Sequence, residues 1–305
     1  MTELSGQEHR VEDVERGLHL ILRLGEVMPE EASQEIGTIY ETVQTRLRVP
    51  FVNFIFRVLA NYPLYLSFAW NKIEPHLLTT RFEEAADALR GRALLEPVPV
   101  LESVDLTALS DLNQIRGFTD TIHYVLPKLL LVVSALDEGL GGETGIADEA
   151  PEAGVQPGLA EGTMSLPMVT TAEATGRLKE LFEEIRERHG HPDVASYYRG
   201  VARWPGFLEA VWEQIGLLVG TAPYKERKRD LLEAARSVVL ELPLPSSGEV
   251  GQRSVTEEQV EELRAILAVF RFRVISDTFL EVSLIKALLE GPESARYSRF
   301  SFAAR

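Results

Sequence analysis

The chain has 305 residues, of which 45% are hydrophobic and 26% charged, which is ordinary for a globular protein with a buried core. Asp and Glu outnumber Lys and Arg by 47 to 31, and the resulting net charge of −16 repels phosphate backbones and anionic lipid surfaces, so we expect neither nucleic acid nor membrane as a partner. The absence of cysteine excludes disulfides, thiolate metal sites and cysteine nucleophiles, and it fits a reducing compartment.

The N-terminal segment gives no sign of a targeting signal. It reads MTELSGQEHRVEDVERG and lacks a basic stretch followed by an apolar one, so we expect no signal peptide. The longest apolar run, LLLVVSAL at 129–136, is far shorter than the roughly 20 residues that span a bilayer, and Asp137 and Glu138 close it. These features predict a cytoplasmic protein.

The first predicted helices lie between residues 32 and 73. In ASQEIGTIYETVQTRL, apolar residues recur at the spacing of a helix that buries one face. A second helical stretch runs from about Val52 to Asn61, and Pro63 ends it because proline lacks the N–H group and clashes with the preceding turn. The helix after Pro63 carries Trp70 at helical spacing, which favours a core role over a site role for this side chain.

The stretch GGETGIADEAPEAGVQPGLAEG, residues 141–162, has no apolar period and is rich in Gly, Ala, Pro and Glu. Such a composition is typical of an exposed linker, with an ordered surface loop as the alternative. We therefore divide the chain into a helical repeat at 1–142, a linker at 143–163 and a second helical repeat at 164–305.

The second repeat shows the same order of patterns. ATGRLKELFEEIRERHG predicts a helix that stops at Gly190, and a short helical stretch then ends at Pro205. VTEEQVEELRAILAVFRFRV opens with Thr256 and Gln259 at the spacing of a capping box. Because no long stretch alternates apolar and polar residues, we predict an all-α fold.

The two halves are related by an internal duplication with a shift of 142 residues. Chance would give roughly three identities over positions 27–73, given ordinary residue frequencies, whereas a dozen occur. The identical pairs are Val27/Val169, Ala32/Ala174, Glu41/Glu183, Arg46/Arg188, Pro50/Pro192, Val52/Val194, Arg57/Arg199, Ala60/Ala202, Pro63/Pro205, Leu66/Leu208, Trp70/Trp212 and Ile73/Ile215.

Two homologous helical repeats are expected to pack as an intramolecular pseudo-dimer, with a ligand pocket at their seam. The chain entries near Pro50 and Pro192 are then candidate pocket walls. Arg57 and Arg199 lie on otherwise apolar helices, and each is expected either to pair with a carboxylate across the interface or to extend to water.

The stretch LRVPFVNFIFRVLANYPLYLSFAW, followed by AADALRGRALLE, resembles the first half of the group I 2-haloacid dehalogenases, which act on both D- and L-2-haloacids. PKLLLVVSAL, ASYYRGVARWP and VISDTFLEVSLIKALLEG resemble later segments of that family in the same order. The resemblance implies an all-α pseudo-dimer with its active site between two fused repeats. It also implies that an aspartate activates a water, which attacks the substrate Cα directly and inverts its configuration, while an asparagine helps to hold that water.

The family's site residues carry over unevenly. The aromatic wall falls on Phe51 and Phe54, with Phe51 in place of a tryptophan, and the serine beside the catalytic aspartate falls on Ser196. The aspartate itself falls on Tyr197 and the asparagine on Leu126, so the resemblance implies a divergent member that lacks the catalytic aspartate. Tyrosine, with a pKa of about 10, is a poor base at neutral pH, and leucine cannot hydrogen-bond a water.

On the last helix, Ile275 matches a pocket position of the family, whereas Arg271 stands for a pocket tyrosine and Thr278 for an isoleucine. Two nearby residues are candidates for a substitute base. Asp193 lies about one helical turn before the aspartate position, with a helix cap as the alternative interpretation, and His123 precedes Leu126 by three residues, with a buried structural histidine as its alternative.

Two further groups of polar residues have competing interpretations. Asp277 and Glu281 share a face of the last helix and are candidates for an acid or base, or for one exposed stripe. HGHPD at 189–193 cannot easily close two histidines and an aspartate on one ion, so we expect no metal, and no cofactor.

Two functions follow. The first is a hydrolase of this family, acting on the carbon–halogen bond of a small 2-substituted carboxylic acid with a relocated base. The alternative is a non-catalytic homologue that binds an apolar small molecule in the seam pocket. The sequence leaves open whether the fused chain forms a homodimer.

Overall fold

The computed structural model describes residues 2–98, 111–145, 154–252 and 255–300, which form helices and connecting loops. Within those ranges there is no β-strand, and Gly145 and Pro243 form an isolated bridge, so the predicted all-α class is confirmed. The elements are α1 (Thr2–Leu24), α2 (Gln34–Leu47), α3 (Phe54–Leu59), α4 (Pro63–Ile73), η1 (Glu74–His76), α5 (Thr80–Ala93), α6 (Leu112–Leu140), α7 (Gly176–His189), α8 (Ser196–Val201), α9 (Pro205–Ile215), α10 (Ala222–Val239), α11 (Ser247–Gly251), α12 (Glu257–Val269), η3 (Phe270–Ile275), α13 (Ser276–Glu290) and η4 (Pro292–Arg296).

The helix boundaries follow local chemistry that the sequence displays. Pro63 and Pro205 occupy the first positions of α4 and α9, where a missing N–H group costs no hydrogen bond. The predicted capping box of α12 forms, because Gln259 N donates to Thr256 Oγ1 at 3.2 Å and Thr256 N donates to Gln259 Oε1 at 3.1 Å. Gly190 ends α7 in a left-handed conformation with φ of 61°.

Three pairs of helices have matching boundaries. α2 and α7, α3 and α8, and α4 and α9 each begin and end 142 residues apart. The backbone bonds that attach the preceding loops also match, since Val27 N donates to Arg57 O and Val169 N donates to Arg199 O, both at 3.0 Å. The two halves thus correspond in their helix lengths and also in a backbone hydrogen bond between residues 30 positions apart.

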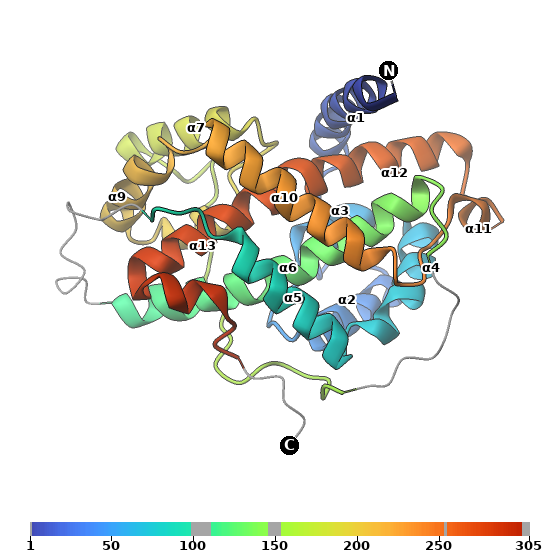
Figure 1. Ribbon diagram of the computed structural model, residues 1–305, viewed down its shortest axis with the longest axis horizontal. Coiled ribbons are helices and arrows are strands. Elements are labelled where there is room, and N and C mark those ends of the chain that lie inside the picture. Colours follow the sequence, from blue (N-terminus) through green and yellow to red (C-terminus); the bar gives the residue numbers. More distant parts are fainter. Residues whose placement is uncertain (1, 99–110, 146–153, 253–254, 301–305) are drawn as a thin grey trace.

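The long helix α6 occupies the centre of the molecule. Figure 1 shows α2 and α4 towards one end of the long axis and α7 and α9 towards the other, with α6 and α13 running between them. By length and composition α6 is apolar enough to cross a membrane, but its apolar window is 100% buried inside the protein, as in the core helix of a soluble fold.

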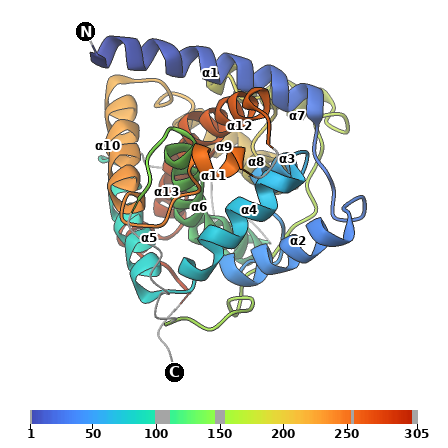
Figure 2. The ribbon, with the colours of Figure 1, turned by 90° about the vertical axis from the view of Figure 1, so that its right-hand side faces the viewer.

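The N-terminal helix α1 packs against α12 rather than against α2 or α4, and Figure 2 shows it lying across one edge of the molecule. Gly17 permits this contact, because a Cβ atom there would lie 2.1 Å from the Ala265 carbonyl oxygen. Arg16 and Arg23 add exposed ion pairs to Glu261 and Glu262 at 3.1 and 3.0 Å. The first helix of the predicted N-terminal repeat therefore rests on the C-terminal half.

The joining segment differs from the expected exposed linker over the part that the structure describes. Gly154 N and Val155 N donate to Leu78 O at 3.0 and 2.9 Å, and Ala160 N donates to Arg48 O at 3.0 Å. Val155 and Ala160 are buried, so residues 154–163 form an ordered loop on the N-terminal half. Residues 146–153 of the predicted linker lie outside the described part of the chain.

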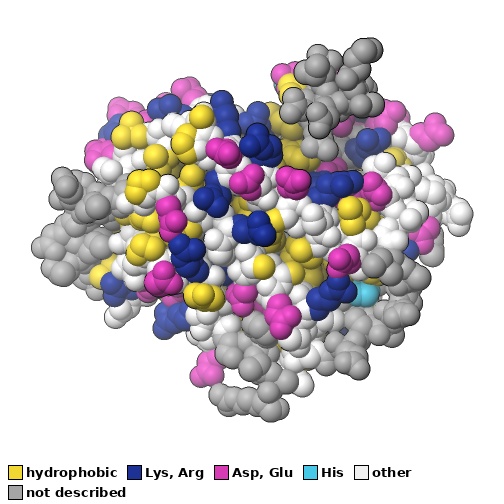
Figure 3. Space-filling model, viewed as in Figure 1, with side chains coloured by type: hydrophobic (Ala, Val, Ile, Leu, Met, Phe, Trp, Pro, Cys, Tyr) yellow, Lys and Arg dark blue, Asp and Glu magenta, His cyan; other side chains and the backbone are white. Residues whose placement is uncertain are grey.

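The face that α5 and α10 present to solvent carries acidic and basic side chains side by side (Figure 3). Arg236 illustrates the pattern, because it pairs with Glu143 at 2.9 Å and with Glu138 at 3.0 Å. Exposed pairs of this kind contribute at most about 1 kcal/mol each, so packing around α6 rather than surface charge holds the fold.

Candidate active site

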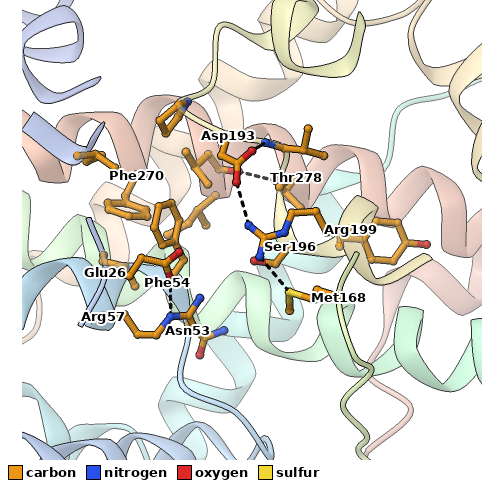
Figure 4. A pocket seen from close by; sticks show the side chains of 18 of the residues that line it. Glu26, Asn53, Phe54, Arg57, Met168, Asp193, Ser196, Arg199, Phe270 and Thr278 are labelled. Atoms are coloured by element: carbon orange, nitrogen blue, oxygen red, sulfur yellow. Dashed lines mark hydrogen bonds and ion pairs between the residues drawn. The ribbon is translucent and has the colours of Figure 1, made fainter. Parts of the chain in front are cut away.

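A cavity of about 780 Å³ opens beside the short helices α3 and α8. Residues between 21 and 57 form one wall, residues between 168 and 199 form the other, and α6 and the η3–α13 junction close the floor. The chain entries at 51–53 and 192–195 thus both lie at the cavity, where the sequence analysis expected pocket walls. Figure 4 shows the labelled side chains converging from these segments.

Eight of the predicted site residues line this cavity. They lie on elements that are far apart in the sequence and meet at the cavity. Their individual roles stay predictions. The eight residues are Phe51, Phe54, Leu126, Asp193, Ser196, Tyr197, Ile275 and Thr278. Phe54 also packs edge-on against Phe270, with 5.1 Å between ring centroids, and this contact makes one wall apolar.

Tyr197, which the resemblance predicts at the aspartate position of the family, is held in the wall of the cavity. Its hydroxyl group lies 3.0 Å from Thr119 Oγ1, and its ring stacks on Phe118 with 5.9 Å between centroids. Burial raises the pKa of Tyr197 well above its usual value of 10, so the phenol stays protonated at neutral pH. It therefore cannot serve as a base there.

Asp193 presents a carboxylate to the same cavity. Its Oδ1 accepts a hydrogen bond from Val194 N at 2.7 Å, and its Oδ2 pairs with Arg199 Nη1 at 2.9 Å. The side chain is 37% exposed, so water can reach it. The capping interpretation of Asp193 is wrong, because α8 begins at Ser196 and its N-cap residue is Ala195.

A second carboxylate–guanidinium pair faces the cavity from the other wall. Arg57 Nε donates to Glu26 Oε2 at 2.5 Å, and Arg57 Nη1 donates to Val52 O. Figure 4 shows this pair apart from the Asp193–Arg199 pair, with Phe54 and Ser196 labelled between them. Each arginine thus pairs with a carboxylate of its own half, not across the seam as one interpretation expected.

Comparison with known proteins identifies the family of this chain. A family model described as "Halocarboxylic acid dehydrogenase DehI" matches residues 50–198. A "2-haloacid dehalogenase, configuration-inverting" from Alcaligenes xylosoxydans xylosoxydans is 32% identical over 286 residues, covering 88% of this chain and 95% of the relative. The chain belongs to the haloacid dehalogenase family.

Other members of the family are similar over most of their length. An "(R)-2-haloacid dehalogenase" from Pseudomonas putida is 28% identical over 282 residues, covering 85% of this chain and 91% of the relative. A solved D-2-haloacid dehalogenase mutant superposes with a TM-score of 0.75 at 25% identity, covering 87% of this chain and 96% of the other. A solved complex of D-2-haloacid dehalogenase with L-LA gives a TM-score of 0.74 at 26% identity, with the same coverage.

Two predicted site residues lie away from the cavity of this haloacid dehalogenase homologue. His123 is buried, with Nε2 3.1 Å from Ala295 O, and burial lowers its pKa well below the usual range, so the buried structural alternative describes it. Arg271 pairs with Asp137 at 2.6 Å and Glu138 at 2.8 Å on another side of its helix. The π-helical turn at Phe270–Ile275 adds a residue per turn, which displaces Arg271 from the phase that an α-helix predicts.

Glu281 lies in a buried network and not in the cavity or on an exposed stripe. It accepts hydrogen bonds from Tyr198 Oη at 2.6 Å and Tyr224 Oη at 2.8 Å, and His189 Nε2 lies 2.5 Å from its Oε1. Burial alone would lower the pKa of His189, but the Glu281 carboxylate outweighs burial and raises it to about 9. The network therefore holds a buried ion pair.

Asp277 extends this network by one helical turn. Lys228 Nζ lies 2.7 Å from its Oδ1, and His191 Nε2 lies 3.3 Å from its Oδ2. Although burial opposes the effect, these neighbours hold the pKa of Asp277 well below its usual range. His189 thus forms a buried ion pair with Glu281, whereas burial lowers the pKa of His191, whose neutral ring contacts Asp277. No metal-binding group is found among the described residues.

Asn53 is one of the polar cavity residues that the sequence reasoning missed. It occupies the N-cap position of α3 without making a side-chain cap bond, and its Oδ1 is buried with no hydrogen-bond partner in the described part of the chain. An asparagine before a helix usually caps it, so no sequence pattern predicted that this amide lies at a pocket. A buried acceptor beside a cavity is suited to hold a water.

Proposed function

We propose that this chain binds a small 2-substituted carboxylic acid between two homologous helical repeats and hydrolyses its carbon–halogen bond. The proposed repeats are residues 1–142 and 164–305, joined by 143–163. The matching boundaries of α2–α4 and α7–α9 support the duplication. So do the indole groups of Trp70 and Trp212, which donate to Thr42 at 2.8 Å and Glu184 at 3.1 Å, again 142 residues apart.

A pseudo-dimer explains why the site lies where it does. In a symmetric ancestor the cavity would have two equivalent walls, and fusion allows each wall to change independently. The Glu26–Arg57 and Asp193–Arg199 pairs support this reading, because the arginines are equivalent while their acids come from non-equivalent positions. The seam can therefore offer a bound acid two different surfaces.

The observation that carries the proposal is the position of Asp193 at the cavity, held by Arg199. In the proposed step, Asp193 accepts a proton from a water that Asn53 helps to hold. The water oxygen forms a bond to the substrate Cα as the carbon–halogen bond breaks, and the halide leaves with the bonding electrons. The product is a 2-hydroxy acid of inverted configuration, and we propose that both enantiomers of the substrate are accepted.

A non-catalytic binding protein is the second candidate, and two observations favour it. Tyr197 is buried with its hydroxyl engaged by Thr119, and Leu126 offers no hydrogen bond to water. If Asp193 does not replace the family's base, the activation step is lost, and such a base contributes roughly 10²–10⁴-fold to rate. The cavity would then bind an acid without turning it over.

Halide release from D- and L-2-chloropropionate, measured by ion chromatography, distinguishes the two candidates. We expect both enantiomers to release chloride above the buffer rate and to yield lactate of opposite configuration. No release by the wild-type protein, together with release by the Tyr197→Asp, Leu126→Asn double variant, would instead identify a binding protein that has lost the family chemistry.

A further inference from the structure

Arg199 has donor groups without an oxygen partner among the residues that the structure describes. Its Nη1 pairs with Asp193 at 2.9 Å, whereas Nη2 contacts the Met168 sulfur at 3.9 Å and Nε is buried without a partner among the described residues. A thioether is a weak acceptor, and buried guanidinium groups are normally fully hydrogen-bonded. Arg48, Arg116 and Arg271 also have a buried Nε without a hydrogen-bond partner among the described residues, but of these four arginines Arg199 is the one that lines the cavity.

The equivalent arginine of the other half gives the internal comparison. Arg57 Nε donates to Glu26 at 2.5 Å and its Nη1 donates to the Val52 carbonyl, so two of its three nitrogens have oxygen partners. Arg199 has one oxygen partner, although it lines the same cavity. Arg57 therefore uses its Nε atom for a carboxylate of its own wall, whereas Arg199 uses Nη1 and leaves the Nε–Nη2 edge without an oxygen partner among the described residues.

We propose that Arg199 is the residue that binds the carboxylate group of the substrate, through its Nε–Nη2 edge. The proposal rests on the proposed function, because it assigns an anchor for the same acid. Two parallel N–H···O bonds from this edge match the geometry of a carboxylate, and they are strong where apolar side chains exclude water. Phe51, Phe54 and Leu126 supply such surroundings in this cavity.

Met168 acts as a displaceable cover on this edge. It lines the cavity and contacts Arg199 Nη2 through sulfur (Figure 4). Methionine has three rotatable bonds and can vacate the position, after which a carboxylate oxygen replaces a weak acceptor by a strong one. Because Asp193 stays on Nη1, one guanidinium group positions both the substrate and the base.

Binding of a non-reactive acid tests this assignment without turnover. Isobutyrate has the shape of 2-chloropropionate without a leaving group, and isobutyramide is its neutral counterpart. We expect the wild-type protein to bind isobutyrate at least about tenfold more tightly than isobutyramide in calorimetric titrations, as charge-assisted bonds imply. Arg199→Gln should bring that ratio close to one, and Arg199→Lys should leave an intermediate ratio.

Two further variants keep the test independent of folding and of catalysis. Met168→Gln supplies an internal amide oxygen for Nη2, and it should weaken isobutyrate binding while leaving isobutyramide binding unchanged. Asp193→Asn should retain the preference for the acid. An unchanged ratio in both Arg199→Gln and Met168→Gln would overturn the anchor alone, whereas a wild-type protein that binds neither isobutyrate nor 2-chloropropionate would overturn the proposed function with it.

Discussion

The cavity pair Asp193–Arg199 and the buried network around Asp277 and Glu281 use the same kinds of side chain to different ends. In the network, both oxygens of Glu281 accept hydrogen bonds, and its side chain is 0% exposed. At the cavity, the carboxylate of Asp193 is 37% exposed, and the Nε of its partner Arg199 has no hydrogen-bond partner among the described residues. The two groups of side chains therefore differ both in exposure and in the hydrogen-bonding capacity that the described residues leave unused.

Removing a carboxylate from the saturated network should have the largest effect. Glu281→Gln leaves the buried His189 charge without its partner, and breaking a buried pair costs about 3–5 kcal/mol of unfolding free energy. Urea denaturation measures this loss. Glu209→Gln, which breaks an exposed pair with Arg177, is the control and should change stability by less than about 1 kcal/mol. Equal effects of the two substitutions would show that the network is not saturated.

The pH dependence of stability should report on the same network. The pKa of His189 is raised from 6.5 to about 9, so its contribution is fully present below pH 6.5 and is lost as pH rises towards 9. The slope contributed by this group is at most about 1.4 kcal/mol per pH unit. Urea denaturation at pH 6.5 and 9 should show this loss in the wild-type protein and a smaller one in His189→Gln. If stability falls equally with pH in the wild-type protein and in His189→Gln, then His189 and Glu281 do not form a charged pair.

The sequence predicted the helices that carry these two groups of residues better than it predicted the polar contacts between their side chains. The duplication from Val27 to Ile73 and the helix ends at Pro63 and Gly190 depend on local patterns, and the structure has those ends. The bond between Tyr224 and Glu281 joins residues 57 positions apart, and no local pattern encodes it. The sequence therefore placed Asp277 and Glu281 on one helix face but did not indicate which distant side chains would pair with them.

The candidate site shows the same division. The predictions that placed Phe51, Phe54 and Ser196 at the cavity are correct. They depend on the family resemblance and on the shift of 142 residues, and both concern short segments without gaps. Arg271 does not line the cavity, since the π-helical turn changes the phase of the helix that carries it. Asn53 was not predicted as a site residue, because an asparagine directly before a helix such as α3 is commonly its cap.

On the cavity side, Asn53→Ala should lower the rate of halide release by about tenfold, the equivalent of one hydrogen bond of roughly 1.4 kcal/mol to the attacking water. Stability should not fall, because Asn53 Oδ1 has no partner in the described structure to lose. Steady-state chloride release and thermal unfolding measure the two effects. A destabilised variant with an unchanged rate would make Asn53 a structural residue.

The smallest effect is expected for Tyr197→Phe. The substitution removes the hydrogen bond to Thr119, at a cost of about 1 kcal/mol, and leaves the ring stacked on Phe118. Because the pKa of Tyr197 is raised well above 10, the phenol stays protonated at neutral pH and does not act as a base, so we expect halide release to be unchanged. A loss of rate without a loss of stability would assign Tyr197 a role in the reaction.

The most direct measurement is the rate of chloride release from 2-chloropropionate by the wild-type protein and by Asp193→Asn, with thermal unfolding recorded for both. The substitution preserves the size of the side chain and disturbs one partly exposed pair, so stability should change by less than about 1 kcal/mol. We expect the rate of chloride release by Asp193→Asn to be at least about 100-fold lower than that of the wild-type protein. An Asp193→Asn protein that is as stable as the wild type and releases chloride as fast would contradict it.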